Sequence, residues 1–141
     1  MTRDPGYTID TDLSRIDLDR VHHWLSTDAY WAMGRPRETV QRAAEASLNF
    51  GVFDENGALR GYARVVTDGA TFAWLCDVYI DRDARGRGAG SLLARAVVDT
   101  LAPMDLKRIM LATADAHGVY EKVGFTPVPD PRMLMVLSAA S

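Results

Sequence analysis

Apolar residues recur at helical spacing in several stretches of the chain, and polar or turn-forming residues separate these stretches. Asp17 precedes one such stretch and is suited to cap a helix, and Pro36 is favourable in the first turn of the next. Gly124 follows the last stretch and is typical of a helix end. The pattern predicts helices over Leu18–Leu25, Pro36 to about Leu48, Gly88–Leu101 and Ala116–Val123.

Other stretches are rich in β-branched, aromatic and aliphatic residues and are bounded by turns, which is typical of strands. Asn56-Gly57 is a strong hairpin turn, and Asp68-Gly69 makes a second turn, so three of the strands are expected to form an antiparallel meander. The predicted strands are Tyr7–Asp10, Phe50–Asp54, Leu59–Thr67, Thr71–Ile80, Arg108–Thr113 and Met133–Leu137. Pro127, Pro129 and Pro131 are expected to hold an extended loop before the final strand.

The order of these elements predicts an α/β fold of the α+β kind, a mixed, mostly antiparallel sheet with helices on its faces. Arg108–Thr113 reads as a buried strand that lies parallel to Thr71–Ile80 across a β-α-β connection. At 141 residues we expect a single domain over 1–141.

Composition adds limits to this picture. The chain is 48% hydrophobic with a net charge of −3, so a real core is expected and nucleic acid is not favoured as a partner. The single Cys76 allows no internal disulfide, and neither a signal peptide nor a membrane-spanning stretch is recognisable. A cytoplasmic location and no membrane partner are therefore expected, with the chain as a monomer or a homodimer.

The most informative stretch joins a strand to a helix through alternating glycines. Arg85-Gly86-Arg87-Gly88-Ala89-Gly90 leads into Ser91 and the helical run that follows. Glycines permit a sharp turn and a close backbone approach, and a helix start offers unpaired N–H groups to an anion, here a phosphate. The spacing fits neither a Walker A loop nor a dinucleotide-binding loop.

The glycine run matches the pattern [QR]-x-x-G-x-[GA] and resembles the pyrophosphate loop of the GNAT N-acetyltransferase superfamily. A second segment, from Ala116 to Phe125, resembles the A-x-x-x-Y-E-K-x-G-F signature of that superfamily. The resemblance implies a GNAT-like fold and transfer of an acetyl group from acetyl-CoA, without a metal, to an amine of a small molecule or a peptide. It also implies that the coenzyme lies on the strand and loop residues Val78, Tyr79, Ile80, Arg85, Gly86, Arg87, Gly88, Ala89, Gly90 and Ser91.

The resemblance makes Tyr120 the expected general acid, since a phenol can supply the proton that a departing thiolate needs. The alternative is a core aromatic residue. Thr113 stands where many relatives carry an asparagine that holds the coenzyme, and it keeps only a hydroxyl for that role. Asp115 is expected to cap the following helix.

Asp77 is the carboxylate nearest the expected site and is a candidate general base. Strict alternation places Asp77 with Leu75 and Tyr79, on the face opposite Trp74 and Cys76, whereas relatives with a strand-borne base place it on the latter face. Asp77 is therefore either a base or a buried structural carboxylate.

Tyr30, Trp31 and Arg35 follow the first helix, where GNAT-like folds cover the acceptor site, and an aromatic wall with arginines would suit an acceptor that bears a carboxylate. The alternative is that Trp31 packs on the core and the arginines face water. Adjacent His22 and His23 diverge on a helix, so a metal site is not expected. A second reading of the whole chain is a non-catalytic module that senses acyl-CoA.

Overall fold

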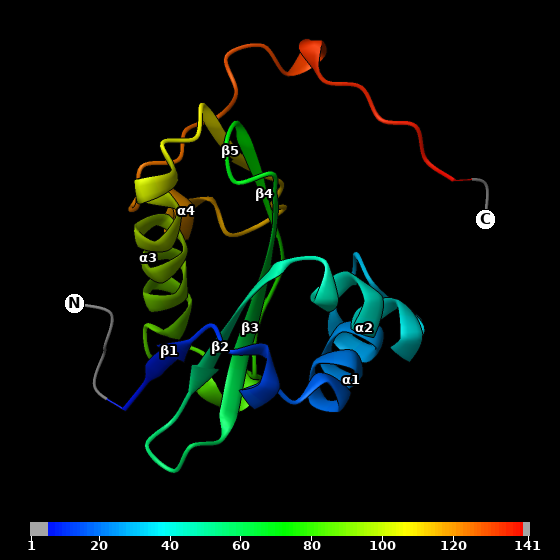
Figure 1. The fold of residues 1–141 in the computed structure, drawn as a ribbon, viewed down its shortest axis with the longest axis vertical. Helices are drawn as coiled ribbons and strands as arrows, with labels where there is room; N and C mark the ends of the chain where they lie inside the picture. Colours follow the sequence, from blue (N-terminus) through cyan, green and yellow to red (C-terminus); the bar gives the residue numbers. More distant parts are fainter. Residues whose placement is uncertain (1–5, 140–141) are drawn as a thin grey trace.

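One five-stranded sheet organises the molecule, and its strands lie side by side in chain order (Figure 1). The structure is a computed structural model that describes residues 6–139. The strands are β1 (Thr8–Asp10), β2 (Leu48–Phe53), β3 (Leu59–Thr67), β4 (Phe72–Ile80) and β5 (Arg108–Leu111). The first four strands pair antiparallel and β5 pairs parallel to β4, so the predicted mixed sheet is confirmed.

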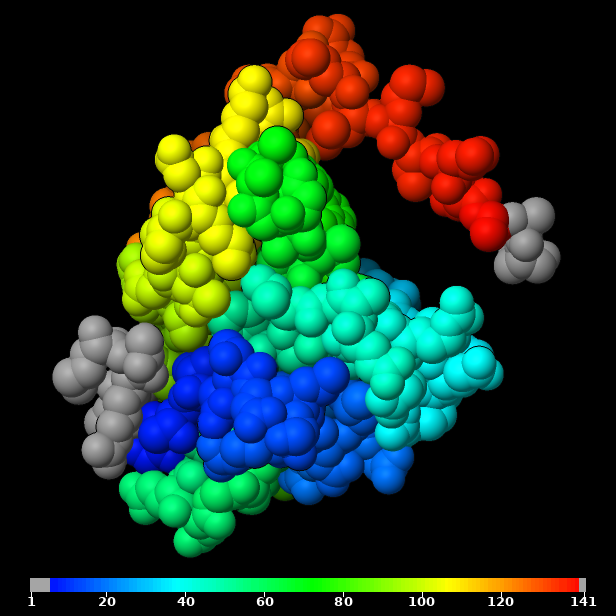
Figure 2. Space-filling view, in the orientation of Figure 1, coloured from blue at the N-terminus to red at the C-terminus, as the bar shows by residue number. Residues whose placement is uncertain are grey.

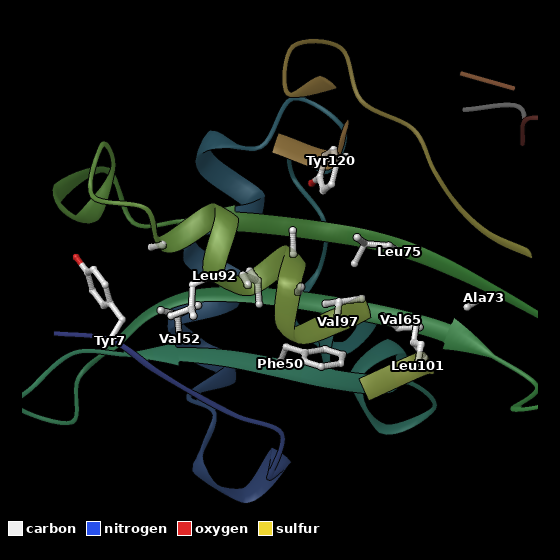
Figure 3. Close-up of a cluster of buried hydrophobic side chains, with 14 of the residues drawn as sticks. Tyr7, Phe50, Val52, Val65, Ala73, Leu75, Leu92, Val97, Leu101 and Tyr120 are labelled. Carbon is white, nitrogen blue, oxygen red and sulfur yellow. The ribbon is translucent and has the colours of Figure 1, made fainter. Parts of the chain in front are cut away.

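Helices cover both faces of this sheet (Figure 1). One face carries α1 (Leu18–Asp28) and α2 (Arg37–Glu45), and the other carries α3 (Ala89–Leu101) and α4 (His117–Glu121). Each layer has its own core cluster between helices and sheet. The cluster between α1, α2 and the sheet includes Val21, Leu25, Val40, Tyr62 and Tyr79. The cluster between α3 and the sheet includes Phe50, Val65, Leu75, Leu93 and Val97. Figure 3 shows the second cluster between α3 and the strands.

The ends of the N-terminal helices have local causes. The Asp17 carboxylate accepts hydrogen bonds from the N–H groups of Asp19 and Arg20, as expected of a cap. Helix α2 ends at Glu45, three residues before the predicted end at Leu48. The Asn49 amide donates to the Ala44 carbonyl at 2.9 Å and so satisfies a carbonyl at the helix end, and the chain then enters β2.

Two predictions at the far end of the sheet are wrong. Met133–Leu137 forms no strand, because a short 3-10 turn occupies Pro131–Met133 and the rest pairs with nothing among residues 6–139. Strand β5 ends at Leu111, two residues early, and none of its residues is fully buried. As a result, the outer edge of β5 has no further strand beside it among residues 6–139.

Strand β4 carries a bulge in its second half. Tyr62 pairs with Tyr79 and Arg64 pairs with Cys76, so three steps along β4 face two steps along β3. Asp77 takes up the extra residue with a φ of 52°, a left-handed conformation that aspartate tolerates better than most residues. None of the helices within residues 6–139 is long and apolar enough to cross a membrane.

Candidate active site

A cavity of about 960 Å³ follows the second half of β4. Strand β5 pairs with β4 only over Phe72–Leu75, so the later residues of β4 have β3 on one side and, within residues 6–139, no strand on the other. Because the two parallel strands separate at this point, a ligand has access to the β4 backbone itself.

The cavity brings together nearly all the residues that the sequence singled out. Its lining includes Tyr30, Trp31, Arg35, Asp77, Val78, Tyr79, Ile80, Arg85, Gly86, Gly88, Ala89, Gly90, Ser91, Thr113 and Tyr120. Arg87 is the exception, since its exposed side chain is not part of the lining.

The loop before α3 closes one end of the cavity. Gly86 and Gly88 have φ values of 80° and 83°, which only glycine adopts readily, and Gly88 forms the N-cap of α3. No acceptor within residues 6–139 takes the N–H groups from Gly86 through Ser91; the first helical bond runs from the Leu92 N–H to the Gly88 carbonyl. Six consecutive amides are thus free for an anion, which fits the pyrophosphate of a coenzyme.

Positive charge lies beside these amides. Arg82 and Arg85 both reach the Asp28 carboxylate at the end of α1, and the Arg85 Nε also donates to the Ile80 carbonyl at 2.9 Å. Hydrogen bonds from Arg82 and the Tyr79 hydroxyl hold the pKa of Asp28 well below its usual range. Two guanidinium groups share one carboxylate here, so this end of the cavity keeps an excess positive charge.

Tyr120 lies on the opposite wall, on α4 (Figure 3). Its ring is 8% exposed and meets Phe125 edge to face at a centroid distance of 5.9 Å. Its hydroxyl has no hydrogen-bond partner in the described part of the chain. Burial raises the pKa of the Tyr120 phenol, and the Asp115 carboxylate raises it further, so the phenol is protonated at neutral pH.

The start of α4 corrects one prediction. Asp115 does not cap the helix; the Ala116 N–H donates instead to the Thr113 hydroxyl at 3.0 Å. This bond occupies a lone pair of the Thr113 oxygen and leaves its proton available to the cavity.

The bulge also corrects the predicted faces of β4. Leu75 packs in the cluster under α3, whereas Tyr79 packs in the cluster under α1 and α2. Asp77 contacts Arg64. Arg64 and Tyr62 are two residues apart on β3 and share a face, and Tyr62 packs in the cluster on the side of α1 and α2. Asp77 therefore lies on the Cys76 face of β4 and not on the Leu75 face. One extra residue shifts the alternation, which the sequence pattern did not reveal.

Asp77 is held by three donors. Its side chain is 3% exposed and accepts from the Trp31 indole at 2.9 Å, from Arg35 at 2.8 Å and from Arg64 at 3.0 Å. Burial alone would raise the pKa of Asp77, but Arg35, the indole and Arg64 outweigh it and lower the pKa. The carboxylate is therefore ionised at neutral pH, and two guanidinium groups again surround one carboxylate.

The segment that carries Trp31 and Arg35 is tied back to α1. The Gly34 N–H donates to the Ser26 carbonyl at 2.9 Å, and the Arg35 carbonyl lies 3.0 Å from the His22 ring nitrogen Nε2. Tyr30 lies against Trp31 edge to face and is 65% exposed, so it faces the open side of the cavity. This arrangement fixes Arg35 at the cavity wall.

Among the side chains that line this cavity, sequence reasoning missed Asp28 and Arg64, which form ion pairs there. Asp28 is an acidic residue at the C-terminal end of a helix, where the helix dipole disfavours negative charge, and this mismatch was a usable signal. Arg64 becomes visible only with the register of β3 against the bulged β4. Residues 6–139 hold no group of three His, Cys, Asp or Glu side chains placed to bind a metal ion.

Comparisons with known proteins agree with this geometry. The model of the Acetyltransferase (GNAT) family matches residues 18–125. A crystal structure from Xanthomonas campestris pv. campestris, described as an acetyltransferase of the GNAT family, is similar with a TM-score of 0.90 and 42% identity, over 97% of this chain and 96% of that one.

Two further proteins are more distant. A Gibberella zeae protein that is provisionally named an acetyltransferase is 27% identical over 135 residues, which cover 82% of this chain and 76% of that protein. The N-acetylglutamate synthase of Neisseria gonorrhoeae, solved with coenzyme A and N-acetyl-glutamate, shares the fold with a TM-score of 0.70 and 16% identity, over 88% of this chain and 29% of that one. The family match spans most of the sequence, and this chain belongs to the GNAT family of acetyltransferases.

Proposed function

We propose that this protein is an N-acetyltransferase that moves the acetyl group of acetyl-CoA to the amine of a small molecule or peptide. One observation carries the proposal: six free amides at the start of α3 and the Tyr120 hydroxyl open onto the same cavity. A helix start can bind the phosphates of the coenzyme, and a protonated phenol can supply the proton that the departing thiolate needs.

In this proposal the coenzyme pyrophosphate binds the amides from Gly86 to Ser91, and Arg85 adds a charged hydrogen bond. The pantetheine arm lies along Val78, Tyr79 and Ile80, where β4 lacks a second neighbour. The Thr113 hydroxyl donates from the facing wall. The Arg87 side chain, in contrast to its backbone amide, lies outside the lining and adds only long-range charge.

Acetyl-CoA supplies an activated thioester, whose carbonyl carbon forms a bond with the amine nitrogen as the carbon–sulfur bond breaks. Tyr120 donates its proton to the sulfur that leaves, because a phenol with a raised pKa holds that proton until negative charge develops nearby. The attacking nitrogen must first lose a proton, and water within the cavity accepts it.

Two roles were open for Asp77, and its contacts support the structural one. A base needs a free lone pair and a pKa near the working pH, whereas Asp77 accepts three hydrogen bonds and has a lowered pKa. We therefore assign Asp77 as a positioning residue that holds Arg35 and Arg64 at the cavity wall.

The charge balance at this wall favours an acceptor amine that carries a carboxylate. Arg35 and Arg64 bring two positive charges and Asp77 brings one negative charge. Arg35 makes one side-chain hydrogen bond among residues 6–139 and is partly exposed, so its remaining N–H groups are available to a ligand. A planar guanidinium binds a carboxylate through two parallel hydrogen bonds, and Trp31 and Tyr30 supply an apolar wall beside it.

The test is a thiol-release assay with acetyl-CoA and matched pairs of amines. Lysine and cadaverine differ only by the carboxylate, so the proposal expects the higher kcat/KM with lysine and loss of this preference in Arg35→Gln. Equal rates with both amines in the wild type would contradict the proposed acceptor class and leave the transfer reaction itself standing.

A sensor that binds acyl-CoA without turnover is the competing function. Tyr120→Phe keeps the ring and removes only the hydroxyl, so we expect kcat to fall ~10-fold or more while the dissociation constant for acetyl-CoA is unchanged. If the wild type binds acetyl-CoA in calorimetry but releases no thiol with any amine, the sensor function replaces the enzyme. The proposed reaction takes place in the cytoplasm, the location expected from the sequence.

A further inference from the structure

The outer edge of β5 is the least protected part of the sheet. The sheet order places β5 last, so one of its two edges has no partner strand among residues 6–139. Ile109, Met110 and Leu111 are only half-buried, although all three are large and apolar, whereas Phe50 and Val65 on inner strands are fully buried. An apolar strand with an open edge is a template for pairing with another chain.

The same chain also carries an unpaired apolar segment, Met133–Leu137, which we call the C-terminal arm. Its side chains are 80%, 53%, 97%, 86% and 98% exposed in chain order. Figures 1 and 2 show the arm running clear of the rest of the molecule. Five consecutive apolar residues in water are unfavourable, and this composition is typical of a strand.

The segment before the arm directs it away from its own β5. Pro127, Pro129 and Pro131 fix φ at alternate positions, and the residues between them, Val128 and Asp130, each precede a proline and are held extended. Such a run is stiff and resists folding back on itself. In the structure it leaves α4, passes the end of the sheet and delivers the arm to open solvent (Figure 1).

We propose that the arm of one copy pairs with the free edge of β5 in a second copy, and that the second copy returns the same contact. The lengths are similar, because β5 has four residues and the arm has five. Each chain offers one unpaired β5 edge and one free arm, so a closed two-fold dimer satisfies both at once. The exchange completes the sheet with the sixth strand that the sequence pattern contains.

The exchange also supports the cavity. Leu111, which ends β5, and Thr113 both line the cavity wall opposite β4. A strand paired to the outer edge of β5 therefore covers the back of this wall. This inference does not depend on the proposed reaction.

The first test measures the mass of the full chain in solution by light scattering across a range of concentrations. One chain is 15.5 kDa, and we expect twice this mass. Leu134→Glu combined with Val136→Glu is expected to return the mass to that of one chain. Both side chains are exposed in the single chain, so this variant is expected to keep the wild-type circular dichroism spectrum.

Val128→Glu is the control, because it places one glutamate on a partly exposed apolar residue outside the arm, and it is expected to remain a dimer. A wild-type chain that stays monomeric at high micromolar concentration would overturn the proposal. A dimer that survives the two arm substitutions would overturn it as well, because another surface would then hold it.

The second test asks which β5 the arm meets. Chains with Met110→Cys are co-expressed with chains with Met135→Cys and then oxidised, with the wild type, which retains Cys76, as the background. Exchange predicts a disulfide-linked dimer in the mixture and much less in either variant alone. In a single chain that carries both substitutions, exchange predicts a linked dimer, and a cross-linked monomer would show that the arm folds onto its own β5 and refute the proposal.

Discussion

Replacing Asp77 by Asn tests whether this carboxylate organises the cavity wall. The substitution keeps the size of the side chain and removes its charge, so Arg35 and Arg64 lose their common counter-ion. Removal of one partner from a buried ion pair costs about 3–5 kcal/mol. The side chains of Arg35 and Arg64 are 21% and 16% exposed, so water offsets part of this loss. We expect the free energy of unfolding to fall by about 2–3 kcal/mol.

For a domain of this size, about 3–4 °C of Tm corresponds to each kcal/mol, so the Tm should fall by about 6–12 °C at pH 7. The pKa of Asp77 is lowered in the folded protein. Its stabilising contribution is therefore fully present above the unfolded pKa of about 3.9 and is lost as the pH falls through the lower folded value. The difference in Tm between wild type and Asp77→Asn should be constant from pH 6 to 8, as a rough window, and shrink below about pH 4.

Calorimetric melts of the two proteins across this pH range provide the measurement. Asp99→Asn is the matched control, because Asp99 is exposed and forms no salt bridge among the described residues, so its Tm should equal that of the wild type. A fall of less than about 2 °C at pH 7 would refute the ion-pair reasoning. A large loss of kcat with an unchanged Tm would instead return Asp77 to the role of general base.

Two further predictions concern the loop and the core. Gly88→Glu should abolish acetyl-CoA binding in calorimetry through crowding and charge. Gly57→Glu is the control, because Gly57 has a similar positive φ in the hairpin turn; this variant carries the same backbone strain and should bind acetyl-CoA normally. Binding by both variants would contradict the loop assignment. Leu93→Ala should lower the free energy of unfolding in urea by about 2–5 kcal/mol, because Leu93 is 1% exposed on the inner face of α3. Val98 is half-buried on the same helix, so Val98→Ala should lower this free energy clearly less. Equal losses in the two variants would argue against this core.

Sequence alone predicted most of this fold, because its main signals are local. The Asn56-Gly57 turn set the β2–β3 hairpin, and the glycine run before Ser91 marked the loop and the start of α3. The final strand was predicted wrongly because an apolar pattern indicates that a segment favours pairing with another strand, but it does not indicate which strand is available. Met133–Leu137 has the composition of a strand, but it has no partner strand among residues 6–139.

In the candidate site, the alternating pattern of strand β4 predicts the wrong face for Asp77. Strict alternation would have put Asp77 on the face of Leu75, against the apolar cluster between α3 and the sheet. The one-residue bulge moves the carboxylate to the face that holds Arg35 and Arg64. Pairing between β4 and β5 stops at Leu75, next to the bulge, and the cavity of about 960 Å³ follows the later residues of β4. A bulge bends its strand and increases its twist. We infer that this one irregular residue separates β4 from β5 and also turns Asp77, with Arg35 and Arg64, toward the cavity. Straightening β4 by deletion of Asp77 should therefore disrupt both ends of the cavity together.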